Sequence, residues 1–137
     1  MGLLKYCPTK RAGGIMIKAY RNLLLIGIFI WTATHFFRGT SLMDYEVVKQ
    51  ILWRTPNFAA VWVGVGLTYI TFPLISKKEF DPKHTYLLVG VIMVLLIILE
   101  IVHHIFLESP FDIWDIVASV IASLFIIVIH TTKKYNE

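Results

Sequence analysis

The chain has 137 residues, of which 57% are hydrophobic and 16% are charged, and its mean hydropathy is +0.70. Soluble domains average roughly 25% charged and 45–50% apolar residues, so this composition excludes an ordinary water-soluble domain. The net charge of +4 does not indicate nucleic-acid binding, because the basic residues gather at the ends of apolar segments. The single cysteine, Cys7, excludes an internal disulfide.

Four long apolar segments follow one another along the chain. We expect each to form a membrane-spanning helix of about 20 residues, the length that crosses a ~30 Å hydrocarbon core, over residues 15–37, 56–76, 84–107 and 112–132. The second helix should begin with Thr55 as its cap and Pro56 in its first turn. The predicted fold is therefore an all-α, integral membrane four-helix bundle that forms one transmembrane domain over residues 1–137.

The segment between the first two spans contains a short helical pattern. Its apolar residues recur at helical spacing, namely Val47, Val48, Ile51 and Leu52. We therefore expect a short amphipathic helix that lies in the outer interface of the membrane, before the second span begins.

The lysine and arginine residues predict the orientation of the bundle. Ten of the thirteen precede the first span, lie between the second and third spans, or follow the fourth. The other three, Arg38, Lys49 and Arg54, lie on the opposite side. The positive-inside rule places the larger group in the cytoplasm, so both ends of the chain are expected there.

Glu100 is the most informative single residue, because it lies inside the third apolar segment. A carboxylate within the membrane costs at least ~2.5 kcal/mol on insertion scales, so it should face the bundle and have a partner. His103 and His104 follow at offsets of three and four, which place them beside Glu100 on one helix face. His104 is the preferred partner.

The fourth span opens with Asp112 and Asp115, and a tight turn would bring both toward Glu100. Ser119 continues the same polar stripe. We call this set the polar cluster and predict that it binds a ligand: Glu100, His103, His104, Asp112, Asp115 and Ser119. A simpler interpretation is local, because aspartates also complement the N-terminus of a helix.

Two cofactor hypotheses stay open at this stage, although the sequence does not identify a cofactor. A divalent metal could use carboxylates and a histidine, and the candidates are Glu100, His104, Asp112 and Asp115. A haem could lie between His35 and either His103 or His104. No catalytic residue is predicted, and an enzyme is a less favoured class than a binding protein.

Small residues recur on the fourth span at the spacing that allows close helix packing. Ala118 and Ala122 form one such pair, and Ser119 and Ser123 form an overlapping one. We expect Ala118, Ala122 and Ser123 to contact another helix. The packing stripe and the polar stripe would then coincide on one face.

The stretch from Glu100 to Ser123 resembles the VanZ-like family of small bacterial membrane proteins. That family typically has a Glu late in one helix and Phe-Asp-x-x-Asp at the start of the next. Glu100 matches the first feature and Phe111-Asp112-Ile113-Trp114-Asp115 matches the second, whereas Ser119 and Ala122 replace the usual Asn and Gly. The resemblance implies the bacterial inner membrane and a role in the cell envelope. The family is named for its association with glycopeptide resistance.

The predicted function follows from the cluster and the resemblance together. We expect an envelope protein whose outer-facing cluster engages a polar lipid head group, a lipid-linked precursor or a cation. The alternative is a non-catalytic accessory subunit of a larger membrane protein complex, with the small-residue stripe as its docking surface. Membrane lipids are the expected partners, joined by other membrane protein subunits under the alternative, and nucleic acid is not expected.

Overall fold

Nearly all the residues that the structure describes lie in helices. The computed structural model covers residues 9–78, 80–106 and 111–135, and these ranges contain no strand. The elements, with η marking a short 3-10 helix, are α1 (Thr9–Arg38), η1 (Ser41–Asp44), α2 (Glu46–Ser76), η2 (Pro82–His84), α3 (Thr85–Phe106) and α4 (Ile113–Tyr135). The all-α prediction is confirmed for these residues.

Four helices in the described ranges are long and apolar enough to cross a membrane. The segments that meet this requirement are Met16–Arg38, Glu46–Ser76, Pro82–Phe106 and Ile113–Thr132. The prediction of a multi-pass membrane protein is therefore confirmed at the level of helix length and composition. The predicted end of the third span, Leu107, lies outside the described residues.

The second helix is longer than the sequence predicted. α2 runs without a break from Glu46 to Ser76, so its first ten residues are not a separate helix. The predicted start at Thr55 and Pro56 is wrong, because Thr55 Oγ1 donates to the carbonyl of Ile51 at 2.7 Å within the helix and Pro56 lies inside it. At ~1.5 Å per residue α2 extends about 46 Å, well beyond a ~30 Å hydrocarbon core.

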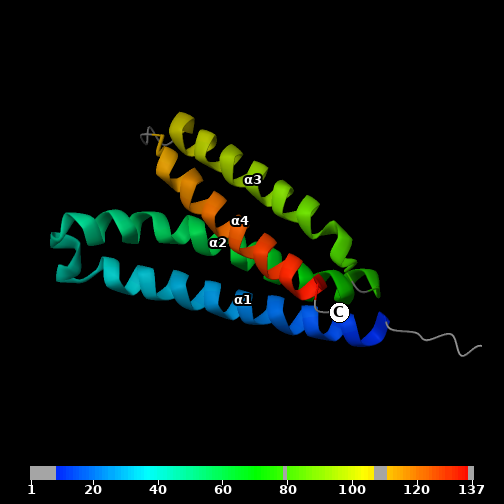
Figure 1. Ribbon diagram of the computed structural model, residues 1–137. Helices are drawn as coiled ribbons and strands as arrows, with labels where there is room; N and C mark the ends of the chain where they lie inside the picture. Colours follow the sequence, from blue (N-terminus) through cyan, green and yellow to red (C-terminus); the bar gives the residue numbers. More distant parts are fainter. Residues whose placement is uncertain (1–8, 79, 107–110, 136–137) are drawn as a thin grey trace, which may run out of the picture.

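α1 and α2 form a closely packed antiparallel pair, and Figure 1 shows them side by side along their length. Gly66 of α2 permits the contact, because a Cβ there would lie 2.6 Å from the carbonyl oxygen of Tyr20 and 2.7 Å from the Cβ of Leu24. Gly27 of α1 plays the same part further along, where a Cβ would lie 3.0 Å from Val63 Cγ2. At both positions a larger residue would push the helices apart.

α4 packs on α2, and α3 lies at the edge of the bundle. The indole N–H of Trp62 on α2 donates to the carbonyl of Ala122 on α4 at 3.2 Å, and Phe125 of α4 contacts Trp62 edge to face. Most apolar side chains of α3 are exposed, as expected of a helix that borders lipid. Figure 1 shows α3 and α4 diverging from α1 and α2 toward the end where α3 finishes and α4 begins.

At the opposite, converging end, all four helices meet in a set of buried polar and aromatic contacts. Tyr20 of α1 stacks on Tyr69 of α2 with ring centroids 3.9 Å apart, and its hydroxyl hydrogen-bonds His130 Nδ1 of α4 at 3.0 Å. The Tyr69 hydroxyl hydrogen-bonds the hydroxyl of Thr85 at the start of α3. These four side chains are only 0–2% exposed. We call them the four-helix joint.

Candidate functional site

Glu100 and Asp112 connect the end of α3 to the start of α4. The Glu100 carboxylate accepts the backbone N–H of Asp112 at 3.1 Å. The Asp112 carboxylate in turn accepts the backbone N–H of Trp114 at 2.9 Å, which satisfies a donor that the first turn of a helix leaves without a partner. Asp112 therefore performs the local helix-terminal role considered above, and Glu100 holds its backbone in place.

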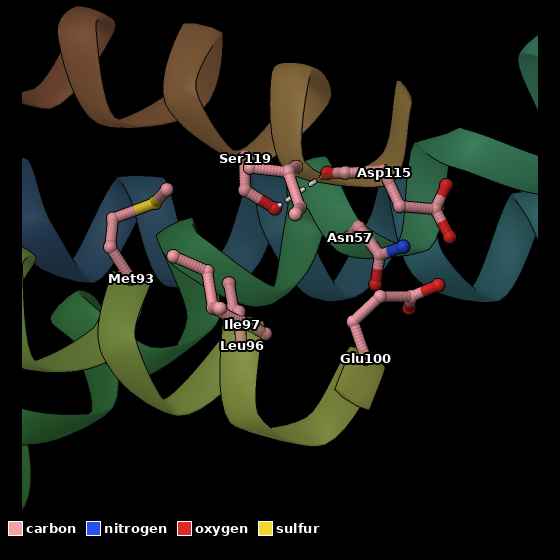
Figure 2. Close-up of a pocket in the computed structure, with 8 residues that line it drawn as sticks. Asn57, Met93, Leu96, Ile97, Glu100, Asp115 and Ser119 are labelled. Carbon is pink, nitrogen blue, oxygen red and sulfur yellow. Dashed lines mark hydrogen bonds between the residues drawn. The ribbon is translucent and has the colours of Figure 1, made fainter. Parts of the chain in front are cut away.

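Asp115 lies one turn further along α4, beside a small pocket. The pocket has a volume of about 10 Å³, close to what one water molecule needs. Figure 2 shows the Asn57 amide near the carboxylates of Asp115 and Glu100. Ser119 also lines the pocket, and its buried hydroxyl donates to the backbone carbonyl of Asp115 at 2.9 Å. The remaining lining is apolar and consists of Met93, Leu96, Ile97 and Ile116.

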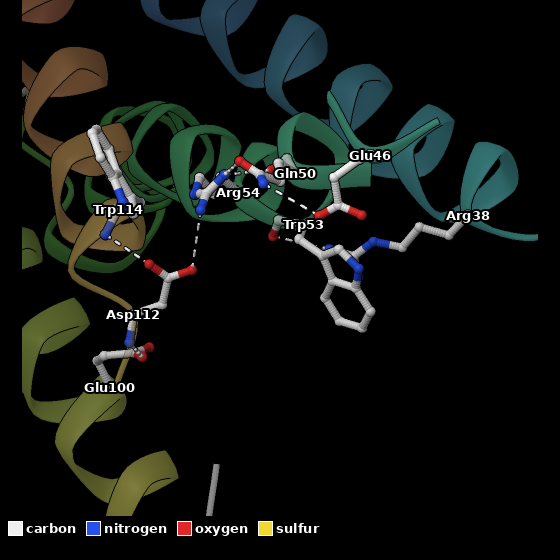
Figure 3. A network of polar contacts seen from close by, with 8 residues as sticks. All are labelled: Arg38, Glu46, Gln50, Trp53, Arg54, Glu100, Asp112 and Trp114. Carbon is white, nitrogen blue, oxygen red and sulfur yellow. Dashed lines mark hydrogen bonds and ion pairs between the residues drawn. The ribbon is translucent and has the colours of Figure 1, made fainter. Parts of the chain in front are cut away.

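Arg54 links α2 to the start of α4, as Figure 3 shows. Its Nη2 lies 3.6 Å from Asp112 Oδ2. Its Nη1 donates to the backbone carbonyl and the side-chain oxygen of Gln50, at 3.1 and 3.3 Å. The guanidinium carbon lies 5.7 Å from the ring centroid of Trp114. Arg54 therefore offsets the charge of Asp112, the carboxylate that caps α4.

Arg38, the last residue of α1, compensates for the proline inside α2. Pro56 has no N–H, so the carbonyl of Leu52, four residues earlier, loses its usual helical donor. Arg38 replaces that donor: Nε and Nη2 donate to Leu52 O at 3.2 and 2.9 Å, and Nη2 also donates to Trp53 O at 3.0 Å. The guanidinium carbon lies 4.5 Å from the Trp53 ring centroid. These contacts hold the Arg38 guanidinium in one position.

A cleft of about 600 Å³ lies between these groups, where the α3–α4 hairpin separates from α2. Its lining comes from all four long helices and consists of Arg38, Trp53, Pro56, Asn57, Leu96, Leu99, Glu100, His103, Asp112 and Asp115. The volume falls within the range of small-molecule sites in proteins, which combine an apolar lining with a few placed polar groups. The cleft therefore has the size and the mixed lining of a binding site.

The histidines predicted to join the polar cluster lie at different places. His103 lines the cleft, whereas the His104 ring lies edge-on to Phe111 with centroids 6.3 Å apart. His35, the other haem candidate, lies edge-on to Trp31 at 5.3 Å. Among the described residues, no three His, Cys, Asp or Glu side chains are arranged to hold a metal ion. The structure does not bring the four metal candidates together as a ligand set.

The small residues of α4 lie inside the chain's own core. Ala122, Ser119 and Ser123 are buried, and Ala118 is half-buried. The Ser123 hydroxyl donates to the carbonyl of Ser119 at 2.9 Å, one turn away. Because Trp62 of α2 bonds the backbone of Ala122, this face of α4 contacts α2.

The half of the cleft that α1 and α2 contribute was not predicted from the sequence. Arg38 and Asn57, which line the cleft, and Arg54, which pairs with Asp112, are distant in sequence from the acidic residues, so no local motif connects them. The sequence nevertheless held a signal for the two arginines. Only three of the thirteen lysine and arginine residues lie on the side of the bundle opposite the other ten, and two of these three are Arg38 and Arg54. Basic residues on the side of the membrane that has fewer lysines and arginines are candidates for partners of intramembrane carboxylates.

Comparison of the chain with protein-family models, curated proteins and solved structures gives no match. The resemblance to the VanZ-like family therefore depends on Glu100 and on the motif from Phe111 to Asp115. In the structure, the two parts of that motif come together through the hydrogen bond between Glu100 and the backbone of Asp112.

Proposed function

We propose that this chain is a VanZ-like protein of the bacterial inner membrane that binds the polar head group of a lipid in the cleft. The cleft carries the proposal, because its wall combines charged side chains with apolar ones such as Leu96 and Leu99. A lipid presents the same combination, with a polar head joined to apolar chains. Charged residues within a membrane protein mark functional sites by default.

The position of the cleft along the helices supports a head group as its ligand. Arg38 is the last residue of the first apolar span, and Asp112 directly precedes the fourth. The ends of spans lie where hydrocarbon meets the lipid head groups. A lipid that enters from the side would thus bring its head to the charged wall and its chains to the apolar wall.

We place the cleft on the outer face of the membrane, with both ends of the chain in the cytoplasm. The distribution of lysine and arginine supports this orientation. The first turns of α2, on the same side as the cleft, expose Val47 by 72%, Ile51 by 60% and Trp53 by 55%. Apolar and aromatic side chains of this kind favour the membrane interface. The interfacial segment is then an extension of the second span.

Labelling of single cysteines tests this orientation. In a Cys7→Ser background, Tyr45→Cys should react with a membrane-impermeant thiol reagent in intact cells, and Lys78→Cys should react only after the cells are opened. Tyr45 and Lys78 are both exposed and lie beyond opposite ends of the bundle. The reverse pattern would place the cleft on the cytoplasmic face and contradict the proposed orientation.

Lipid retention tests the binding function itself. The wild-type protein purified in mild detergent should carry bound lipid when examined by native mass spectrometry. Glu100→Gln and Asp115→Asn should reduce that lipid, since they remove charge from the cleft with little change of shape. The control is Asp44→Asn, on the same side but in η1 and outside the cleft. Equal lipid retention in all four proteins would overturn the proposal.

A double variant adds a second criterion. If Glu100 and Asp115 act on one ligand, Glu100→Gln with Asp115→Asn should lose no more binding than the worse single variant. Losses that add would mean that the two carboxylates act at separate sites.

The accessory-subunit alternative loses its proposed docking surface. That interpretation used the small residues of α4, and three of them are buried against the chain's own helices. A partner subunit would have to bind elsewhere.

A further inference from the structure

We infer that the cleft takes a lipid head group that carries a primary amine and a phosphate together. This inference rests on the proposed function and specifies the chemical class of its ligand. Three independent parts of the cleft point to that class: an acidic wall, a fixed guanidinium and an apolar wall between α2 and α3.

The acidic wall favours a cation, because the three carboxylates of Glu100, Asp112 and Asp115 face only two guanidinium groups, those of Arg38 and Arg54. Arg54 lies against Asp112, so the pair formed by Asp112 and Arg54 is close to neutral. Among the described residues, Glu100 and Asp115 form no close ion pair of their own, although Asp115 lies within electrostatic reach of Arg54 and Arg38, and Figure 2 shows both carboxylates on the same side of the pocket beside Asn57. Two carboxylates in a poorly hydrated place repel each other, and a ligand ammonium would relieve that repulsion. Its N–H groups would donate to the carboxylate oxygens.

The guanidinium of Arg38 supplies the complementary group. Nε and both N–H groups of Nη2 are directed to the carbonyls of Leu52 and Trp53. An arginine has five N–H donors, so two remain on Nη1. No hydrogen bond joins these two to another described residue, and Arg38 lines the cleft. A guanidinium held in this way is suited to a phosphate oxygen.

The apolar wall sets the direction in which the ligand lies. Pro56, Leu96 and Leu99 supply the apolar part of the lining, and most other apolar side chains of α3 are exposed. The chains of the lipid would pass over this wall, with the phosphate at Arg38 and the amine at Glu100 and Asp115. A head group with a phosphate and no amine would add negative charge at Arg38 and bring no ammonium to Glu100 and Asp115. A quaternary amine would fill the space without N–H donors.

Competition between lipids of matched chains tests this class. The wild-type protein would be purified, loaded with an equimolar mixture of phosphatidylethanolamine and phosphatidylglycerol, and examined by native mass spectrometry. A charge-assisted hydrogen bond corresponds to a preference of about tenfold or more, so phosphatidylethanolamine should be retained at least about tenfold over phosphatidylglycerol. When phosphatidylcholine replaces phosphatidylglycerol in the mixture, phosphatidylethanolamine should again be the lipid that is retained more.

Matched variants identify the side chains that produce the preference for phosphatidylethanolamine. Asp115→Asn should abolish the preference for the amine while a smaller amount of either lipid stays bound. Arg38→Lys should weaken both lipids together, because the phosphate is common to them. Asp44→Asn and Lys49→Gln, on the same side and outside the cleft, should leave both the amount and the preference unchanged.

The outcomes separate this inference from the proposed function. If lipid retention depends on the cleft residues but phosphatidylglycerol is retained as well as phosphatidylethanolamine or better, the inferred specificity for an amine is wrong. The proposed function, lipid binding in the cleft, would still stand. Lipid that is unaffected by every cleft variant would overturn both. If the variants fail to fold, glycerophosphoethanolamine should raise the unfolding temperature of the wild-type protein more than glycerophosphate does. Equal effects of these two soluble fragments would reject the inference without any variant.

Discussion

At one end of the bundle, four helices meet through hydroxyl and ring groups that satisfy one another, and at the other end they separate around ionisable groups. The four-helix joint is almost completely buried, and its hydrogen bonds connect α1 to α4 and α2 to α3. The cleft is open, and its groups include three carboxylates and a guanidinium. Groups that hydrogen-bond one another are tolerated within a membrane, whereas carboxylates and guanidinium groups are costly there and mark functional sites.

This difference indicates that the two ends contribute to different properties. Removal of contacts at the joint should lower the stability of the fold. Removal of charge at the cleft should alter binding with little loss of stability. Each of the following variants tests that division by thermal unfolding of the purified protein in mild detergent, in order of decreasing expected effect.

Gly66→Ala should have the largest effect. Its Cβ would lie 2.6 Å from the Tyr20 carbonyl oxygen and 3.1 Å from the backbone of Leu24, and backbone atoms cannot turn aside as side chains do. We expect a loss of about 3 kcal/mol, at the upper end of overpacking effects. Gly90→Ala is the control, because a Cβ there meets nothing within 4 Å. If the two variants were equally stable, the close α1–α2 contact would be absent in the membrane.

Ala122→Leu should have the second largest effect. Ala122 is fully buried, and Trp62 bonds to its carbonyl. The larger side chain should displace α4 from α2 and cost about 2 kcal/mol, within the range for insertions into packed cores. Val120→Leu should be nearly silent, because Val120 is 42% exposed and faces away from this contact. Comparable losses at both positions would show that α4 packs through a different face.

Tyr20→Phe removes the hydroxyl that bonds His130 and keeps the ring that stacks on Tyr69. Hydrogen bonds between membrane helices are worth about 0.6 kcal/mol on average and up to ~1.7, so we expect a loss of about 1 kcal/mol. The effect should largely disappear when His130 is already replaced by Phe, since the bond is then missing in both proteins. Full additivity of the two substitutions would exclude a Tyr20–His130 bond.

Asp112→Asn should have the smallest effect on stability. Asparagine can still accept the Trp114 N–H as a helix cap, so the substitution removes mainly the 3.6 Å ion pair with Arg54. Partly exposed ion pairs contribute about 0–1 kcal/mol. Asp112→Ala should lose roughly 1 kcal/mol more, because the cap is lost as well. A large loss in Asp112→Asn would mean that charge at the cleft end holds the fold together.

The spans could be predicted from sequence because long apolar segments have one physical interpretation at this length. The start of α2 could not, because Thr55 and Pro56 are a standard helix beginning and nothing local indicates that a helix already exists. A residue of another helix, Arg38, supplies the hydrogen bond that makes Pro56 tolerable inside α2. Local rules do not include such a distant donor.

The candidate site was predicted only in part, because local patterns again miss residues that are distant in sequence. Glu100, Asp112 and Asp115 were found because they lie close together along the chain, near the end of one apolar segment and the start of the next. Arg38 and Asn57 belong to the cleft through the packing of α1 and α2 against the α3–α4 hairpin. His104 was expected at Glu100 from helix spacing, and the structure places the backbone N–H of Asp112 at that carboxylate.

The contact between Arg38 and the Leu52 carbonyl also bears on how the protein is made. Membrane helices insert first and associate afterwards. When α2 inserts, Pro56 leaves the Leu52 carbonyl without its helical donor, and a poorly hydrated backbone group without a hydrogen-bond partner costs about 1–3 kcal/mol. α1 is synthesised before α2 and ends in the residue that supplies the missing donor. The α1–α2 hairpin is therefore the natural first unit of assembly, onto which the later pair of helices docks.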